Sequence, residues 1–391
     1  MKAKKNSTFL KIMKRVLITI IIILIAAIVT LFALSPAKID PLLDQNGETY
    51  PNGIAERVMI DVGDMKLGAF LLGENADNPV LLYMHGGPGM PSLFLDEAHT
   101  YPERLEKYFT VCYLEQRGTA SSYDKNMSLD KLNYAVMIED TKLVTDYLSE
   151  RFGQEKIYLF GVSWGTYLTT KTAHKYPDSY MAVINSGQIA DSVRSERETY
   201  DYLLTLTAES GDTKALELLK KYNPDENPDA LVTAEYLYNV RGPLVEKYRI
   251  GSSRFKTMGL MNIIGASLSF KGYTVPEKLS AYKSSMISLE HVGESAPGDI
   301  LYHFTQQQVP FFILMGEYDY QTTANLAREF YNKLDAPIKE FVLFKNAAHG
   351  ISDDYPQAFA QYVASVIDKV DTNRTSTPAT NEYEIAPERD L

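Results

Sequence analysis

The chain has 391 residues, which is long enough for one large domain with an insertion or for two ordinary domains. Its residues are 45% hydrophobic and 23% charged, a composition that excludes a wholly disordered chain, a collagen or a coiled coil. The net charge is −11, but six basic residues precede residue 16 without any acid; subtracting them from 39 leaves 33 Lys and Arg against 50 Asp and Glu, a balance of −17 for the body. Because a body with this much negative charge repels phosphate backbones, we expect no nucleic-acid partner.

The N-terminus predicts a transmembrane helix over residues 16–34. This stretch carries no charge, and at about 1.5 Å per residue it nearly matches a hydrocarbon core of about 30 Å. The basic segment before it, residues 1–15, should stay in the cytoplasm by the positive-inside rule. The alternative is a cleaved signal peptide, for which Ala33 and Ser35 offer a small-x-small site that Pro36 should block. We therefore expect a single-pass cell-membrane protein whose catalytic domain is extracytoplasmic.

Beyond a linker at residues 35–50, runs of β-branched and aromatic residues alternate with helical patterns. The first two runs, 57–62 and 66–73, alternate in polarity as an antiparallel hairpin does. The later runs are apolar throughout, which is typical of strands buried on both faces: PVLLYM, FTVCYL, KIYLF, MAVINS, PFFILM and EFVLF. Amphipathic stretches such as 133–152 separate several of them. The pattern predicts an α/β fold, with a mostly parallel sheet and helices on both faces.

Two segments depart from this alternation. Residues 188–305 have helical spacing and no comparable buried strand, although a βα connection needs only a few residues. We expect them to form a helical cap inserted between two parts of one catalytic domain, 51–187 and 306–371. The tail, residues 372–391, lacks apolar periodicity, and we expect it to be disordered.

The strongest chemical signal is the GxSxG spacing around Ser163. It follows the strand KIYLF directly and opens a helical pattern. A nucleophile on a strand-to-helix turn needs small residues two positions away on each side, and Gly161 and Gly165 stand there. The spacing and its context predict a nucleophilic serine.

A glycine-rich loop, HGGPG at residues 85–89, follows the strand PVLLYM. Its backbone N–H groups can turn toward a developing oxyanion, which larger side chains would screen. The expected oxyanion donors are the backbone N–H groups of Gly87 and of Trp164, the residue after the nucleophile. For His85, which begins the loop, we expect a structural role.

A nucleophilic serine needs a base, and the base needs an orienting acid. His349 follows the strand EFVLF and precedes the last helical pattern, and Asp319 follows the strand PFFILM. The chain order Ser163, Asp319, His349 is the one expected of an α/β-hydrolase. Asp353 and Asp354 lie too close to His349 in sequence to be preferred as the acid.

Together these motifs resemble α/β-hydrolases of the proline iminopeptidase type over about residues 50–370. The resemblance rests on HGGPG at 85–89, GxSWG at 161–165, YD at 318–319 and AH at 348–349, and on EQRG at 115–118 where the family has DQRG. It implies that Ser163, Asp319 and His349 form a catalytic triad and that acidic cap residues hold the free amine of a peptide. Trp164 is the only tryptophan, so the Trp-bearing cap motif of many members is absent and a strict preference for proline does not follow.

The resemblance and the triad imply a serine peptidase that releases N-terminal residues from short peptides through an acyl-enzyme. No metal and no organic cofactor is expected. A carboxylate near the acyl site would recognise the ammonium by a charge-assisted hydrogen bond. Glu196 and Glu198, which enter the cap from the catalytic edge, are the candidates; the alternative for both is a solvated acidic helix face.

Two other functions stay open. The same triad serves an esterase or a lipid or amide hydrolase, and a membrane anchor favours that activity. A non-enzymatic surface binding module on a hydrolase scaffold would not require the triad. The oligomeric state is not predicted.

Overall fold

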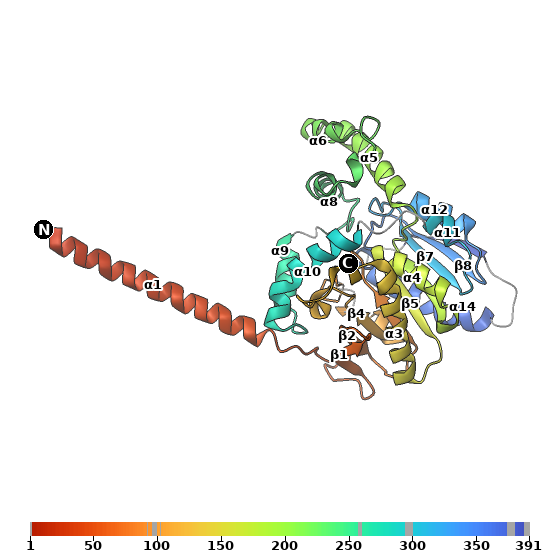
Figure 1. The fold of residues 1–391 in the computed structure, drawn as a ribbon, viewed down its shortest axis with the longest axis horizontal. Helices are drawn as coiled ribbons and strands as arrows, with labels where there is room; N and C mark the ends of the chain where they lie inside the picture. Colours follow the sequence, from red (N-terminus) through yellow and green to blue (C-terminus); the bar gives the residue numbers. More distant parts are fainter. Residues whose placement is uncertain are drawn as a thin grey trace.

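A computed structural model describes residues 2–91, 93–95, 100–101, 103–256, 260–293, 300–373 and 380–386. Its centre is a nine-stranded sheet in the order β1-β2-β4-β3-β5-β6-β7-β8-β9 (Figure 1). The strands are β1 Ile54–Asp61, β2 Lys66–Gly73, β3 Val80–Met84, β4 Thr110–Leu114, β5 Ile157–Val162, β6 Tyr180–Ser186, β7 Phe311–Gly316, β8 Lys339–Phe344 and β9 Thr380–Ile385. β1 pairs antiparallel with β2, and β2 antiparallel with β4; every other neighbouring pair is parallel. The predicted hairpin and the mostly parallel sheet are confirmed.

Alternate residues of the central strands supply two separate cores, one on each face of the sheet. In β3, Val80, Leu82 and Met84 join one core, and Leu81 and Tyr83 join the other. This is the burial on both faces that continuous apolar runs predict. The first core is covered by α3 Tyr134–Phe152, α4 Trp164–Lys175 and α12 Ala324–Lys333; the second by α2 Leu105–Tyr108, α13 Ile351–Asp354 and α14 Pro356–Asn373.

The described residues between β6 and β7 are helical and form two parts (Figure 1). The first has its own small core and contains α5 Ser192–Glu209, α6 Thr213–Leu219, α7 Ala234–Tyr236, a π-helical turn at Leu237–Arg241, and α8 Gly242–Lys247. The second is a helical hairpin of α9 Leu260–Ser269 and α10 Val275–Gly293. The short helix α11 Ile300–His303 then leads back to the sheet.

The N-terminal helix α1, Lys2–Ala33, extends away from the body (Figure 1). Within Lys11–Ala33, the most apolar window of 18 residues has a mean hydropathy of 3.2 and is not buried in the protein. The helix is long and apolar enough to cross a membrane, properties that a signal sequence shares.

Of the tail predicted to be disordered, residues 372–391, positions 374–379 and 387–391 lie outside the described residues. The prediction is wrong for residues 372–373, which end α14, and for residues 380–385, which form β9. This strand pairs in parallel with β8, and Tyr331 donates from its hydroxyl to the Asn381 carbonyl oxygen at 2.9 Å. Its polar sequence, TNEYEI, has no apolar run because an edge strand is held mainly by backbone hydrogen bonds to its neighbour.

β9 should therefore contribute to stability. Removing it uncovers the edge of β8 and deletes the hydrogen bond from the Lys345 N–H to the Ile385 carbonyl oxygen, 2.7 Å. We expect a chain that ends at residue 373 to unfold several degrees below the full chain, whereas a chain that ends at residue 386 keeps the strand and should match it. Equal melting temperatures for all three chains, measured by circular dichroism in detergent, would contradict this prediction.

Candidate active site

Ser163 lies at a sharp turn between β5 and α4. Its backbone has φ 53° and ψ −124°, a conformation that is costly for a residue with a Cβ atom. Its N–H donates to the Ser186 carbonyl oxygen at the end of β6, at 2.9 Å. The turn thus presents the hydroxyl at the carboxyl edge of the sheet, as the GxSxG spacing predicts.

The two flanking glycines are required by close packing. A Cβ atom at Gly165 would collide with the carbonyl oxygen of Met84 at the end of β3. A Cβ atom at Gly161 would lie 2.9 Å from Asn185 Oδ1 and 2.8 Å from Thr169 Oγ1. The turn therefore packs closely between β3 and β6, and this packing restricts how Ser163 can be oriented.

Asp319 and His349 form a buried pair in the loops that follow β7 and β8. His349 Nδ1 lies 2.7 Å from Asp319 Oδ2, and the Asp319 side chain is fully buried. The backbone N–H groups of Gln321 and Thr322 donate to Asp319 Oδ1, each at 2.9 Å. The Thr322 hydroxyl donates to Asp319 Oδ2 at 3.0 Å. These bonds fix the carboxylate so that one oxygen faces the imidazole.

The same region connects the pair with Ser163. Gly187 has φ 67° and directly follows Ser186, the residue that accepts from the Ser163 N–H. A Cβ atom at Gly187 would lie only 2.6 Å from His349 Cε1. The chain after β6 is therefore bonded to the Ser163 turn and touches the imidazole ring, which brings the three predicted residues to one edge of the sheet.

The loop at residues 85–89 approaches Ser163 from β3. A Cβ atom at Gly86 would be 2.9 Å from the Ser163 Cβ atom, and Gly87, with φ 116°, lines the same cavity as Ser163 and Trp164. Both predicted oxyanion donors are thus beside the serine.

His85 is a structural residue. Its Nδ1 lies 2.9 Å from the Gly86 carbonyl oxygen, and its Nε2 accepts from the Gln116 backbone N–H at 3.3 Å. Complete burial lowers the pKa of His85 to about 4, so the ring is neutral at physiological pH. A neutral ring that bridges the HGGPG and EQRG loops fits the expected structural role.

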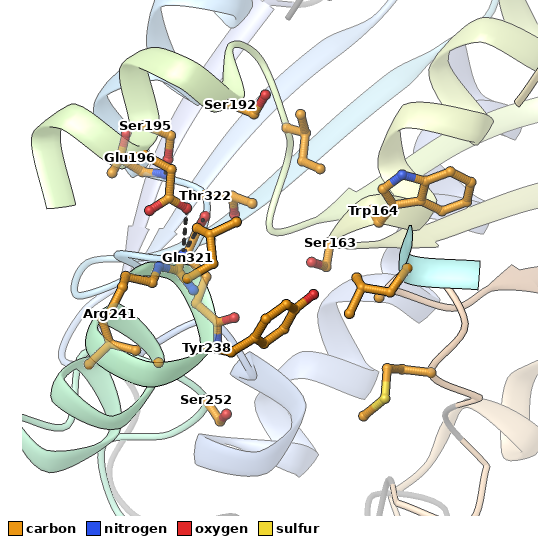
Figure 2. Close-up of a pocket in the computed structure, with 18 of the residues that line it drawn as sticks. Ser163, Trp164, Ser192, Ser195, Glu196, Tyr238, Arg241, Ser252, Gln321 and Thr322 are labelled. Carbon is orange, nitrogen blue, oxygen red and sulfur yellow. Dashed lines mark hydrogen bonds and ion pairs between the residues drawn. The ribbon is translucent and has the colours of Figure 1, made fainter. Parts of the chain in front are cut away.

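A cavity of about 690 Å³ lies beside Ser163, between the sheet edge and the cap (Figure 2). Tyr238, from the π-helical turn, points its hydroxyl end toward Ser163. The charged side chains in its wall are three acids and one base: Asp191, Glu196, Glu246 and Arg241. Asp191 caps α5 by accepting from the Arg194 N–H. The wall therefore has an excess of negative charge.

Glu196 reaches this cavity, whereas Glu198 does not. Glu196 Oε1 pairs with Arg241 Nη2 at 3.1 Å, and its Oε2 is buried without a hydrogen-bond partner among the described residues (Figure 2). Burial raises the pKa of Glu196, and the charge of Arg241 opposes that rise. The prediction that Glu198 shares this position is wrong because residues two apart on a helix point to different sides.

Glu246 on α8 is a cavity residue that sequence analysis missed. Its Oε1 accepts from Ser252 N at 2.7 Å and from Ser252 Oγ at 2.6 Å. Its Oε2 is buried and has no hydrogen-bond partner in the described part of the chain. The segment LVEKY gives no sign of this position, because a Glu-Lys pair in a helix ordinarily lies in solvent.

Glu115, which replaces the family's aspartate, is buried where the cap meets the sheet. It accepts from Ser121 N at 2.7 Å and Ser121 Oγ at 2.5 Å, and from the Tyr273 hydroxyl after α9. Burial raises the pKa of Glu115 to about 7 despite these bonds. A catalytic-domain carboxyl group is thus hydrogen-bonded to a cap residue. Within the described ranges no three His, Cys, Asp or Glu side chains are grouped to hold a metal ion.

Comparisons with known proteins found a matching family, two curated relatives and a solved structure with a similar fold. A family described as the α/β hydrolase fold matches residues 79–221. A Bacillus subtilis (strain 168) protein named "Probable aminopeptidase YbaC" is 27% identical over 77% of this chain and 92% of its own length. A "Proline iminopeptidase" of Thermoplasma volcanium is 23% identical over 72% of this chain and 88% of its length. The crystal structure of the Mycobacterium smegmatis proline iminopeptidase superposes with a TM-score of 0.61 at 15% identity, covering 82% of this chain and 100% of that one.

The chain therefore has the α/β-hydrolase fold and is similar to proteins named aminopeptidase and proline iminopeptidase, which confirms the resemblance seen in its sequence motifs. The solved structure, at 15% identity, supports the fold alone.

The buried Glu115 should make stability depend on pH. Its pKa rises from the ordinary 4.5 to about 7 on folding, so the folded state holds the proton more tightly. The stabilisation is full below pH 4.5 and is lost as the pH rises through about 7. Glutamine at position 115 stays neutral at every pH and serves as the reference. As the pH rises from 4.5 through about 7, we expect the unfolding free energy of the natural chain to fall by up to about 3 kcal/mol relative to that of Glu115→Gln.

Denaturant unfolding in detergent at a series of pH values measures this difference. Glu217→Gln, at a site where the side chain is 69% exposed, is the matched control and should follow the natural chain at every pH. If the difference in unfolding free energy between the natural chain and Glu115→Gln is the same at every pH, Glu115 does not titrate in this interval.

Proposed function

We propose that the chain is a membrane-anchored serine aminopeptidase that releases N-terminal residues from short peptides through an acyl-enzyme. The observation that carries this proposal is the elbow serine beside a buried Asp319–His349 pair, in a cavity with an acidic wall. The names of the relatives, aminopeptidase and proline iminopeptidase, support the same activity.

In the proposed mechanism the Ser163 hydroxyl attacks the carbonyl carbon of the first peptide bond. His349 Nε2 takes the hydroxyl proton, because Nδ1 is held by Asp319. The tetrahedral oxyanion would accept from the N–H groups of Gly87 and Trp164. His349 then gives its proton to the leaving amine, and water, deprotonated by the same ring, hydrolyses the acyl-enzyme and restores Ser163.

The acidic wall supports recognition of a free amine. Glu196 and Glu246 each have a buried Oε2 atom without a hydrogen-bond partner among the described residues, and Arg241 can balance only one of the two carboxylates. An N-terminal ammonium would supply the second positive charge and donate to these oxygens. Since Arg241 already pairs with Glu196, Glu246 is the stronger candidate for the ammonium.

The N-terminal helix supports the proposed location. Lys11–Ala33 is long enough to span the hydrocarbon core, and six basic residues occur among the first fifteen. By the positive-inside rule the catalytic domain would then lie outside the cytoplasm, where it meets extracellular or periplasmic peptides.

An esterase or lipid hydrolase is the second candidate, and one observation favours it. A second cavity, of about 390 Å³, adjoins the first and is lined mainly by apolar side chains from the HGGPG loop, α9 and α10. Both cavities are lined by Met90, Tyr238, Ile263 and Leu289. A substrate held at Ser163 could extend an apolar chain into this space.

Replacing the nucleophile tests the enzyme class. We expect Ser163→Ala to lower kcat/KM by several orders of magnitude, because triad members act as a unit, and to abolish labelling by a fluorophosphonate. Ser128→Ala, at an exposed serine away from the cavity, should keep both. Labelling that persists in Ser163→Ala would refute this nucleophile.

Blocking the amine tests the substrate class. We compare prolyl- and alanyl-arylamides with their N-acetyl forms and with short acyl esters. Acetylation removes the ammonium and leaves a buried carboxylate unpaired, which should lower kcat/KM about ten- to a hundredfold for a charged hydrogen bond of about 1.5–3 kcal/mol. Glu246→Gln should reduce this preference, whereas Glu217→Gln, on exposed α6, should leave it unchanged.

The outcomes separate the two activities. If acetylated amides or esters turn over as well as the free-amine substrates, the aminopeptidase proposal is wrong and the esterase takes its place. A strong preference for free amines that survives in Glu246→Gln would keep the activity but move the ammonium site, with Glu196→Gln as the next variant.

A further inference from the structure

The hairpin of α9 and α10 has an unusual distribution of polarity. The face of α10 that packs on the catalytic domain carries serines: Ser285 Oγ donates to the Gly89 carbonyl oxygen at 2.6 Å, and Ser288 Oγ donates to that of Gly118 at 3.3 Å. The close approach leaves little room, since a Cβ atom at Gly89 would lie 2.7 Å from the Ser288 Cβ atom. The inner contact of this helix therefore includes small polar residues, beside Ile287 and Val292, which pack in the first core of the catalytic domain.

The outer face of the hairpin is apolar instead. The exposed large apolar residues occur at positions i, i+3 and i+7 in both helices, which places each set on one helical face. We call these six residues the hairpin stripe: Met261, Ile264 and Leu268 on α9, and Leu279, Tyr282 and Met286 on α10. Met261, Leu279 and Tyr282 are 75%, 70% and 69% exposed. A helix on a soluble domain normally has the opposite arrangement.

The hairpin is attached to the end of α1 (Figure 1). Lys278 Nζ donates to the Leu34 carbonyl oxygen, just after the helix ends, and to the Leu268 carbonyl oxygen, both at 2.6 Å. The Lys38 N–H donates to the Lys271 carbonyl oxygen at 3.1 Å. The point where α1 would leave a membrane is thus bonded to α10 and to the turn between α9 and α10.

We propose that the hairpin stripe lies in the outer leaflet of the bilayer that α1 spans. The proposal rests on the anchor proposed above. Because α1 ends beside the hairpin, a membrane around α1 brings lipid next to an outward apolar face that would otherwise stay in water. The tyrosine in the stripe suits the membrane interface, where its ring meets hydrocarbon and its hydroxyl meets head groups.

With the hairpin stripe in the outer leaflet, the second, apolar cavity would open toward lipid. Five stripe residues, all except Met261, line the cavity of about 390 Å³. That cavity shares Met90 and Leu289 with the cavity of Ser163. A hydrocarbon chain in the leaflet would therefore have an apolar path toward the serine without crossing water.

Site-specific labels on the full chain test the proposal. The single natural thiol, Cys112, is buried, so a thiol-reactive bimane will mark an introduced cysteine. We would label Leu279→Cys and Met261→Cys in the hairpin stripe. The matched control is Leu143→Cys, at an exposed leucine of α3 on the catalytic domain. Each chain is reconstituted into phosphatidylcholine and phosphatidylglycerol vesicles, with and without lipid that carries a doxyl quencher on its acyl chain.

We expect the doxyl lipid to remove most of the fluorescence of the two stripe labels and to leave the label at residue 143 unchanged. Stripe labels quenched no more than the control, in a chain that stays with the vesicles after a high-salt wash, would overturn the docking alone. A blue-shifted stripe label without quenching would also overturn it, since a protein, such as a second copy of this chain, would then cover the face. Chains lost in the wash, or mature chains from cells that begin near residue 36, would overturn the anchor and the docking with it.

Discussion

The strained turn at Ser163 is the constraint on which the site depends. A side chain with positive φ at this position is tolerated only because glycines at 161 and 165 let the turn pack against backbone from the neighbouring strands. The same crowding brings Gly86 against the Ser163 Cβ atom and so fixes the glycine-rich loop beside it. The proposed nucleophile and the proposed oxyanion donors are thereby positioned by backbone packing, which would need no rearrangement when charge develops.

The remaining parts of the site come from the parallel sheet. Loops after β5, β7 and β8 meet at one edge because parallel strands end on the same side, and buried donors orient Asp319 before substrate arrives. The cap then supplies what the sheet lacks, a wall in which carboxylates outnumber cations. In the proposed function the rigid sheet holds the reacting residues, and the helical insertion supplies the cavity wall that would contact the substrate.

The polarity of the insertion differs between its two parts. The lobe of α5 to α8 buries its apolar residues in a core of its own. The hairpin of α9 and α10 packs serines, Ile287 and Val292 on the catalytic domain and also leaves large apolar side chains exposed. Exposed apolar faces of this size mark sites of contact with a protein or a membrane. The contact between Lys278 and the end of α1 links this face to the N-terminal apolar helix.

The sequence by itself determined the sheet, the elbow, the glycine loop and the acid and base, because these depend on local periodicity and on residue types at short fixed spacings. Tertiary structure alone decided the rest. β9 lacks an apolar run because backbone pairing at an edge holds it; Glu246 reaches the cavity only through the fold of the cap; and Glu198 turns away from it. The outward face of the hairpin is equally invisible in sequence, since an amphipathic pattern gives two faces but not which of them meets the protein.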